Sequence, residues 1–319
     1  MKFDSRYIIA LSVISGISWI IVQNPMTDSY IQGIRPNIHD ARPAAGSLYT
    51  EIQSRTKKFN IPAQDAKIDP IWKTIPGYNG LKVDLDASYK KMKKAGKFDR
   101  KKLIYKQVRP SRHLSDLAPA PIYKANPSKP SASLLINVAW GNEYLQDMLE
   151  VLKKNDVKAT FFLEGRWAKK YPDLAKMIWE GGHEIGNHSY SHPDMARITN
   201  GRANEEIRKT NEIIKAVTGV TPRWFAPPSG SYKDETVDIA KANKLGTIMW
   251  SVDTIDWQKP SPETLIRRVM NKLHPGAFIL MHPTESTAQS LDKLIKSIKA
   301  ENLHLMTVSQ ALSENRIMH

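Results

Sequence analysis

The chain has 319 residues, 41% of them hydrophobic, which is enough to bury a core in one large domain or two ordinary ones. It contains no cysteine, and this excludes disulfides and thiolate metal sites. The net charge is +15 at pH 7, and residues 1–130 carry +13 of it. A basic surface attracts polyanions, but no nucleic-acid-binding motif and no interleaved aromatic residues accompany it, so we expect no nucleic-acid partner.

Residues 7–22 form an uncharged apolar run that follows Lys2 and Arg6. The run is a little short for a membrane span, which needs about 20 residues, and it is as long as a generous signal-peptide core. Its bulky last residues offer no small-x-small cleavage site. We therefore expect residues 1–25 to be an uncleaved signal anchor, with the remaining chain outside the cytoplasm. Cleavage would instead give a secreted protein, and a buried soluble helix is the third alternative.

Residues 26–67 are polar and lack a periodic apolar pattern, which indicates a stalk or linker with one helix around residues 46–58. Residues 68–118 predict a small basic α+β module, with strands at 81–85 and 103–108 and a helix at 87–94. Its Lys-rich stretch is either a surface for an anionic wall polymer or lipid headgroup, or an ordinary solvated face. Residues 119–133 are rich in proline and predict an extended linker or strap.

Residues 134–319 alternate between seven short apolar runs and segments of helical pattern, which predicts a parallel α/β sheet, open or closed. Seven repeats in this length suit a small (β/α)7-type barrel, in which chemistry lies at the carboxyl ends of the strands. The predicted helices are residues 143–154, 167–180, 203–217, 234–244, 262–273 and 287–300.

Four strings at predicted strand ends carry chemistry. In HEIGNHSYSHP, residues 183–193, His188 and His192 are four residues apart, so a helical turn would let both imidazoles reach one ion, whereas His183 suits a barrel interior. With FAPPSGSY, WSVDTIDW and ILMH, this string resembles the motifs of the polysaccharide deacetylase family (carbohydrate esterase family 4), which has a distorted βα barrel. The anchor and the pre-domain are most similar to its sporulation-associated, membrane-anchored subgroup.

The resemblance implies a metal-dependent carbohydrate N-deacetylase, a hydrolase that cleaves acetyl groups from a cell-wall glycan such as peptidoglycan or a chitin-like polymer. His188 and His192 would hold a divalent metal, often zinc, and His282 would be the catalytic acid, oriented by Asp256. A backbone N–H in residues 228–232 would help to hold the oxyanion. The glycan-contacting residues would be Pro228, Ser229, Gly230, Tyr232, Trp257 and Leu280.

The first family motif is altered in this chain. Residues 137–141 read Asn-Val-Ala-Trp-Gly, where the family has threonine, phenylalanine, two aspartates and glycine. Ala139 therefore replaces the base, and Trp140 replaces a metal ligand. Ala226 replaces the arginine that pairs with the base, and that arginine would be a buried unpaired charge once the base is gone. The loss of the base and the loss of its arginine partner are consistent with each other. We therefore interpret the altered site as a coordinated change rather than as random decay.

Glu143 and Glu164 are possible substitutes for the missing aspartates. Ordinary roles also explain both, because Glu143 suits the first turn of a helix and Glu164 the rim of the barrel. With two protein ligands left, we expect the metal, most plausibly Zn²⁺, to bind weakly. Two hypotheses remain: a deacetylase of weak or altered activity, or a catalytically inactive glycan-binding or scaffolding pseudoenzyme at the cell envelope. A wall-binding role for the basic module is a third.

Overall fold

The computed structural model describes residues 47–317, which divide into two compact units. The described part of the smaller unit is residues 47–60 and 83–105, and the larger unit is residues 61–82 and 106–317. The predicted anchor, residues 1–25, and most of the predicted stalk lie outside the described residues. Within residues 47–317, no helix has the length and hydropathy needed to cross a membrane.

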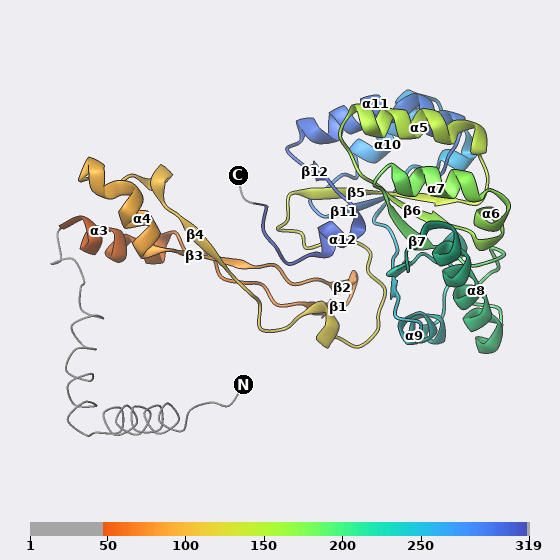
Figure 1. Ribbon diagram of the computed structural model, residues 1–319, viewed down its shortest axis with the longest axis horizontal. Coiled ribbons are helices and arrows are strands. Elements are labelled where there is room, and N and C mark those ends of the chain that lie inside the picture. Colours follow the sequence, from red (N-terminus) through yellow and green to blue (C-terminus); the bar gives the residue numbers. More distant parts are fainter. Residues whose placement is uncertain (1–46, 318–319) are drawn as a thin grey trace, which may run out of the picture. The chain divides into compact units, whose positions relative to one another are not determined.

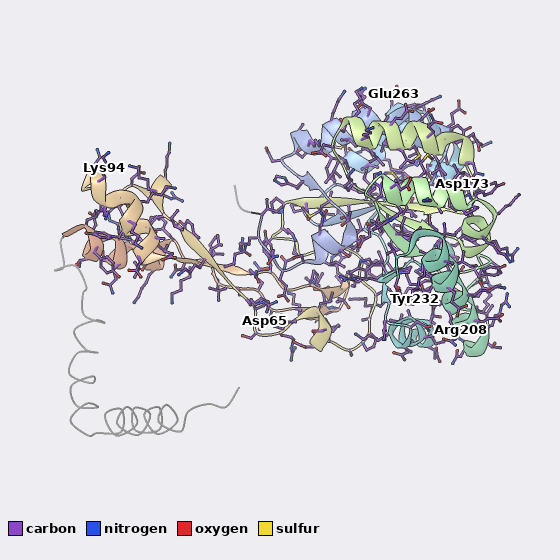
Figure 2. The ribbon with its side chains drawn as sticks, in the orientation of Figure 1. Asp65, Lys94, Asp173, Arg208, Tyr232 and Glu263 are labelled. Atoms are coloured by element: carbon purple, nitrogen blue, oxygen red, sulfur yellow. The ribbon has the colours of Figure 1, made fainter. Side chains whose placement is uncertain are left out.

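The smaller unit is built on two helices, α3 (Ser47–Arg55) and α4 (Leu85–Met92). Asp84 caps α4, and its carboxylate accepts a hydrogen bond from the Ala87 N–H at 3.1 Å. Ile52 and Met92 are buried between the helices. Lys94 is exposed on this unit (labelled in Figure 2). The predicted boundaries at residues 67 and 118 differ from this division, because strands β3 (Gly80–Val83) and β4 (Tyr105–Val108) carry the chain between the units.

The larger unit is organised around an eight-stranded parallel sheet of order β10-β11-β5-β6-β7-β8-β9, with β12 also paired to β5 (Figure 1). The sheet path ends at β10 and β9, so of the two predicted forms the sheet takes the open one, and the expected distorted (β/α)7-type barrel is a curled half-barrel. The strands are β5 Ser131–Val138, β6 Thr160–Leu163, β7 Glu184–Asn187, β8 Trp224–Phe225, β9 Gly246–Thr247, β10 Val252–Asp253, β11 Ala277–Met281 and β12 His304–Leu305.

Helices cover the outer face of the sheet, and α11 packs between α5 and α10 (Figure 1). Alternate β5 residues, from Ala132 to Val138, meet these helices, while Leu135 packs on the inner side with Phe162 and Phe278. Both sheet faces are therefore buried, as parallel sheets require. The helices of the larger unit are α5 Asn142–Lys154, α6 Gly165–Lys170, α7 Pro172–Glu180, α8 Asn200–Thr218, α9 Asp234–Ala242, α10 Pro262–Met270, α11 Glu285–Ala300 and α12 Val308–Leu312. Of these, α12 packs on the inner side, in the same cluster as Leu135.

Two predicted segments are corrected or narrowed by the structure. Residues 167–180 form two helices rather than one, because Pro172 cannot continue α6 and begins α7 instead. The Pro-rich segment 119–133 packs into the larger unit as a strap and does not link two parts. The Ile122 N–H donates to the Thr247 carbonyl at 2.9 Å, and Ile122 pairs with Ile248. The segment thereby covers edge strand β9, which would otherwise expose unpaired backbone groups.

The shorter elements lie in the connections. Strands β1 (Lys67–Asp69) and β2 (Lys73–Ile75) form an antiparallel pair in the larger unit. The 3₁₀ helices are Thr56–Lys58, Lys93–Ala95, Arg100–Lys102, Leu114–Asp116, Pro228–Gly230 and Asp256–Gln258. The last two follow β8 and β10, so they lie at the carboxyl edge of the sheet, where parallel strands bring their loops together.

Candidate functional site

A cavity of about 430 Å³ lies at the carboxyl ends of the strands. This volume is within the usual range for small-ligand sites. Six strands and their following loops supply its walls, as expected for an α/β site built where parallel strands end. Its lining residues are Asn137, Ala139, Trp140, His188, His192, Ser229, Trp250, Asp253, Trp257, Leu280 and His282.

The histidine pair meets in this cavity. The rings of His188 and His192 have their centroids 5.1 Å apart and are nearly perpendicular. Nδ1 of His188 lies 2.8 Å from the Ala226 carbonyl oxygen, so it carries the proton and leaves Nε2 as the free lone pair. Burial lowers the pKa of His188 to about 3, with His192 as a further cause. His188 is therefore neutral at pH 7, the form that binds metals.

A buried carboxylate holds the loop that carries the pair. Glu206 of α8 is 1% exposed, and its carboxylate accepts the N–H groups of Tyr190 and Ser191 at 2.8 and 2.7 Å. Arg202 pairs with the same carboxylate at 2.7 Å. The loop needs this support because Ser189 and His192 have φ values of 61° and 56°, in the left-handed region that side-chain-bearing residues rarely adopt.

His282 and Asp256 form the expected acid dyad. Oδ1 of Asp256 accepts from Nδ1 of His282 at 2.8 Å, and Oδ2 accepts the His282 backbone N–H at 2.6 Å and the Thr287 hydroxyl at 2.7 Å. Asp256 is fully buried and reaches the cavity only through His282. These hydrogen bonds fix the orientation of the His282 ring, which is the geometry that a proton-donating histidine requires.

Trp140 occupies the place expected for a metal-binding aspartate. Its indole lies nearly parallel to the His282 imidazole, with an interplanar angle of 9° and a centroid separation of 5.9 Å. The residue is 48% exposed. The dyad is thus partly covered by an aromatic ring that has no oxygen with which to hold a metal.

The residues present do not fit a three-ligand catalytic metal site. Among residues 47–317, no group of three or more His, Asp or Glu side chains lies close enough to hold one ion. Asp253 lines the same cavity, but its carboxylate accepts the Ile255 N–H at 2.7 Å and does not complete the histidine pair. A catalytic zinc normally has three protein ligands and an open position. The two imidazoles alone offer a weaker site.

Ala226 lies where the family resemblance led us to expect an arginine. It is 2% exposed and belongs to the inner apolar cluster with Leu135, Ile248 and Phe278. Its carbonyl oxygen still orients His188. The Ala226 backbone therefore orients His188, while the Ala226 side chain is part of the apolar core.

The two proposed substitutes lie outside the site cavity. Glu164 caps α6, where it accepts the Trp167 N–H at 3.1 Å, and burial raises its pKa. Glu143 is exposed in the first turn of α5 and does not line the cavity. Both residues line a separate cavity of about 360 Å³ together with Ala139 and Trp140, and neither lines the cavity that holds the histidine pair.

Only one of the predicted glycan-contacting residues in segment 228–232 lines the cavity. Ser229 lines the cavity, with a φ of 52°, while Pro228, Gly230 and Tyr232 do not. The Gly230 and Ser231 N–H groups donate to the carbonyls of Pro227 and Pro228, at 3.0 and 2.9 Å, so neither is free for an oxyanion. The Tyr232 hydroxyl lies 3.0 Å from that of Tyr123 (Tyr232 is labelled in Figure 2).

Three lining residues were not among the predicted site residues: Asn137, Trp250 and Asp253. Each belongs to a motif already singled out, and each is at or next to a strand end. Their position inside those motif strings could have identified them as site residues from the sequence. Asn137 is 5% exposed, and its Oδ1 atom has no hydrogen-bond partner.

Sequence comparison finds relatives of this chain, among them an uncharacterised protein and a deacetylase. It is 52% identical over 302 residues to an uncharacterised protein of Bacillus subtilis, covering 95% of both chains. It is 36% identical over 171 residues to a peptidoglycan-N-acetylglucosamine deacetylase of Bacillus cereus, covering 52% of this chain and 62% of that protein.

A solved structure resembles this chain over more of its length than the deacetylase does. The structure is described as a carbohydrate esterase family 4 pseudoenzyme from Bacillus anthracis; it is 54% identical, covers 85% of this chain and 96% of its own, and has a TM-score of 0.81. A mutant of that pseudoenzyme, 52% identical to this chain, is described as having restored enzymatic activity. The polysaccharide deacetylase family model matches residues 124–248. This chain therefore belongs to the polysaccharide deacetylase family, carbohydrate esterase family 4.

Proposed function

We propose that this deacetylase-like protein binds N-acetylated cell-wall glycan in the site cavity and hydrolyses its N-acetyl groups weakly or not at all. Family membership and the relatives that act on peptidoglycan support the ligand class. The structural neighbours described as pseudoenzymes support the loss of activity. Scaffolding at the cell envelope by glycan binding is the role that such a molecule could perform.

The observation that carries the proposal is the stacking of Trp140 on His282. The ring stands where a metal ligand is expected and covers the acid, while Ala139 beside it has no group that could accept a proton. A positioned general base contributes about 10²–10⁴-fold to the rate. The cavity itself is retained, so binding can persist without efficient hydrolysis.

A second candidate function, slow deacetylation, is favoured by the intact His282–Asp256 dyad. The two candidates are separated by incubating the full chain with chitotetraose and Zn²⁺ and measuring released acetate together with glycan binding. Binding with acetate release at or near background supports the pseudoenzyme. Acetate release well above background supports the slow enzyme, and absence of any glycan binding contradicts both.

The location is also a proposal, and it rests on residues 7–22. Their apolar run without a cleavage site supports a membrane-anchored protein whose larger unit is outside the cytoplasm, in reach of wall glycan. A sporulation-associated role remains a prediction from the same pattern. Mass spectrometry of the mature protein should find the N-terminal residues intact in the membrane fraction. A new N-terminus between residues 23 and 45 would show cleavage and secretion instead.

A further inference from the structure

A second cavity adjoins the site cavity. Its volume is about 580 Å³, and it lies between the start of α5, the loop after β10 and the start of α11. Its lining residues are Trp140, Glu143, Tyr144, Asp256, Trp257, Lys259, Pro260, Ser261, Pro262, Thr284, Glu285, Ser286 and Gln289. Trp140 and Trp257 line both cavities, so the two indoles form the shared wall.

Both tryptophans of this wall are exposed to solvent, although large apolar side chains are usually buried. Trp140 is 48% and Trp257 58% exposed, and exposed aromatic surface beside a cavity commonly marks a binding site. His282 packs against one face of Trp140, which fixes the plane of the indole. Trp140 is therefore a preorganised apolar surface, and little ordering entropy is lost when a ligand packs against it.

The polar groups of the second cavity suit a sugar. Glu143 and Glu285 offer carboxylate oxygens, and Gln289 and Ser261 offer an amide and a hydroxyl. A pyranose ring presents apolar C–H groups on its faces and hydroxyls around its edge. Aromatic walls with a few polar groups match this pattern, since the ring face can pack on indole while the edge hydroxyls form hydrogen bonds.

We propose that Trp140 separates two sugar subsites, with one N-acetylhexosamine in the site cavity and the next sugar of the same glycan in the second cavity. The substitution that removed a metal ligand thereby supplied a glycan-binding surface. The inference rests on the proposed function, and it adds a specific subsite and a specific residue to it. The smallest ligand that fills both subsites is a disaccharide.

Calorimetric titration of the full chain with N-acetylglucosamine, its β-1,4 disaccharide and its tetrasaccharide tests the inference. The disaccharide should bind at least about tenfold more tightly than the monosaccharide. Trp140→Ala should remove about tenfold of the disaccharide affinity, as loss of a buried aromatic anchor commonly does. Trp140→Phe, which keeps an aromatic ring, should retain most of it.

Trp179→Ala is the matched control, because Trp179 is 40% exposed and lines neither cavity. The inference is overturned if Trp140→Ala binds the disaccharide as tightly as Trp179→Ala does, or if the monosaccharide binds as tightly as the tetrasaccharide. In both cases the proposed function stands. If none of the three sugars binds the unmodified chain, the proposed function fails as well.

Discussion

At residue 226, the loss of a charged side chain is coupled to the loss at residue 139. Ala226 packs among buried apolar side chains, so Ala226→Arg alone should place an unpaired cation there and destabilise the protein by several kcal/mol. With Ala139→Asp present, the arginine has a partner. We expect a favourable coupling of about 1–3 kcal/mol in a double-mutant cycle of urea unfolding. Strictly additive effects would show that the two side chains do not meet.

Two imidazoles should bind zinc, but less tightly than a complete family site does. His188 is buried with a fixed ring orientation, whereas the third protein ligand is missing. Calorimetry should show weak binding that His188→Ala abolishes and that Trp140→Asp strengthens. Tight binding that survives His188→Ala would place the metal elsewhere in the molecule.

The site residues differ in how far the sequence could predict them. His188, His192 and His282 belong to long motif strings at strand ends, and the structure places all three in one cavity. Glu143 and Glu164 were candidates by residue type alone, and residue type does not determine where a side chain lies: Glu143 lines the neighbouring second cavity, and Glu164 caps α6. The stacking of Trp140 on His282 depends on a contact across two loops, which no local pattern predicts.

At the scale of elements, α8 holds the histidine loop through Glu206. Glu206→Ala would leave the N–H groups of Tyr190 and Ser191 without their acceptor, at a cost of about 2–4 kcal/mol. We expect a lower free energy of unfolding and weaker zinc binding together. Glu205→Ala is the control, because Glu205 is exposed and its pair with Arg202 should contribute less than about 1 kcal/mol. Equal effects of the two substitutions would contradict the role of Glu206.

Strands β6 and β7 are joined at their amino ends through His183, whose Nδ1 accepts the Ala159 N–H at 3.2 Å. Burial lowers the pKa of His183 to about 4, so the unfolded chain takes up this proton first as the pH falls below the ordinary value of 6.5. Stability is therefore lost between about pH 6.5 and pH 4. Between pH 7 and pH 4.5 the loss from this group should be about 2–3 kcal/mol.

His183→Gln keeps an acceptor for the Ala159 N–H but cannot titrate. Its free energy of unfolding should fall less steeply over the same pH range, and denaturant unfolding at each pH measures the difference. Other titrating groups, His188 among them, are present in both proteins and cancel. Identical pH profiles would mean that His183 is not buried in its neutral form.

The parallel order of elements follows from the alternation of apolar runs and helical segments, and α5, α8 and α11 each begin within three residues of their predicted starts. Whether the sheet closes into a barrel cannot be predicted from the alternation of strands and helices, because closure depends on whether the two edge strands pair. Here β9 is covered by the segment around Ile122, which proline content alone identified as a linker or strap. Proline marks an extended chain without indicating what it packs against.

At the scale of the whole molecule, the similarity to the pseudoenzyme structure extends over more of the chain than the similarity to the deacetylase does. The pseudoenzyme structure covers 85% of the chain, whereas the Bacillus cereus deacetylase aligns over 52%. The extra coverage reaches beyond the family core, so this architecture is shared with the pseudoenzyme to a greater extent than with the active relative.

Acetate release from chitotetraose is the most direct test of the central claim, that coordinated substitutions at residues 139, 140 and 226 removed the chemistry and left the binding site. The unmodified chain and each single variant should be near background. The triple variant Ala139→Asp, Trp140→Asp, Ala226→Arg should exceed the product of the single effects, because groups that act as a unit are strongly non-additive. A triple variant no faster than the unmodified chain, or an unmodified chain as fast as a complete family member, would contradict the claim.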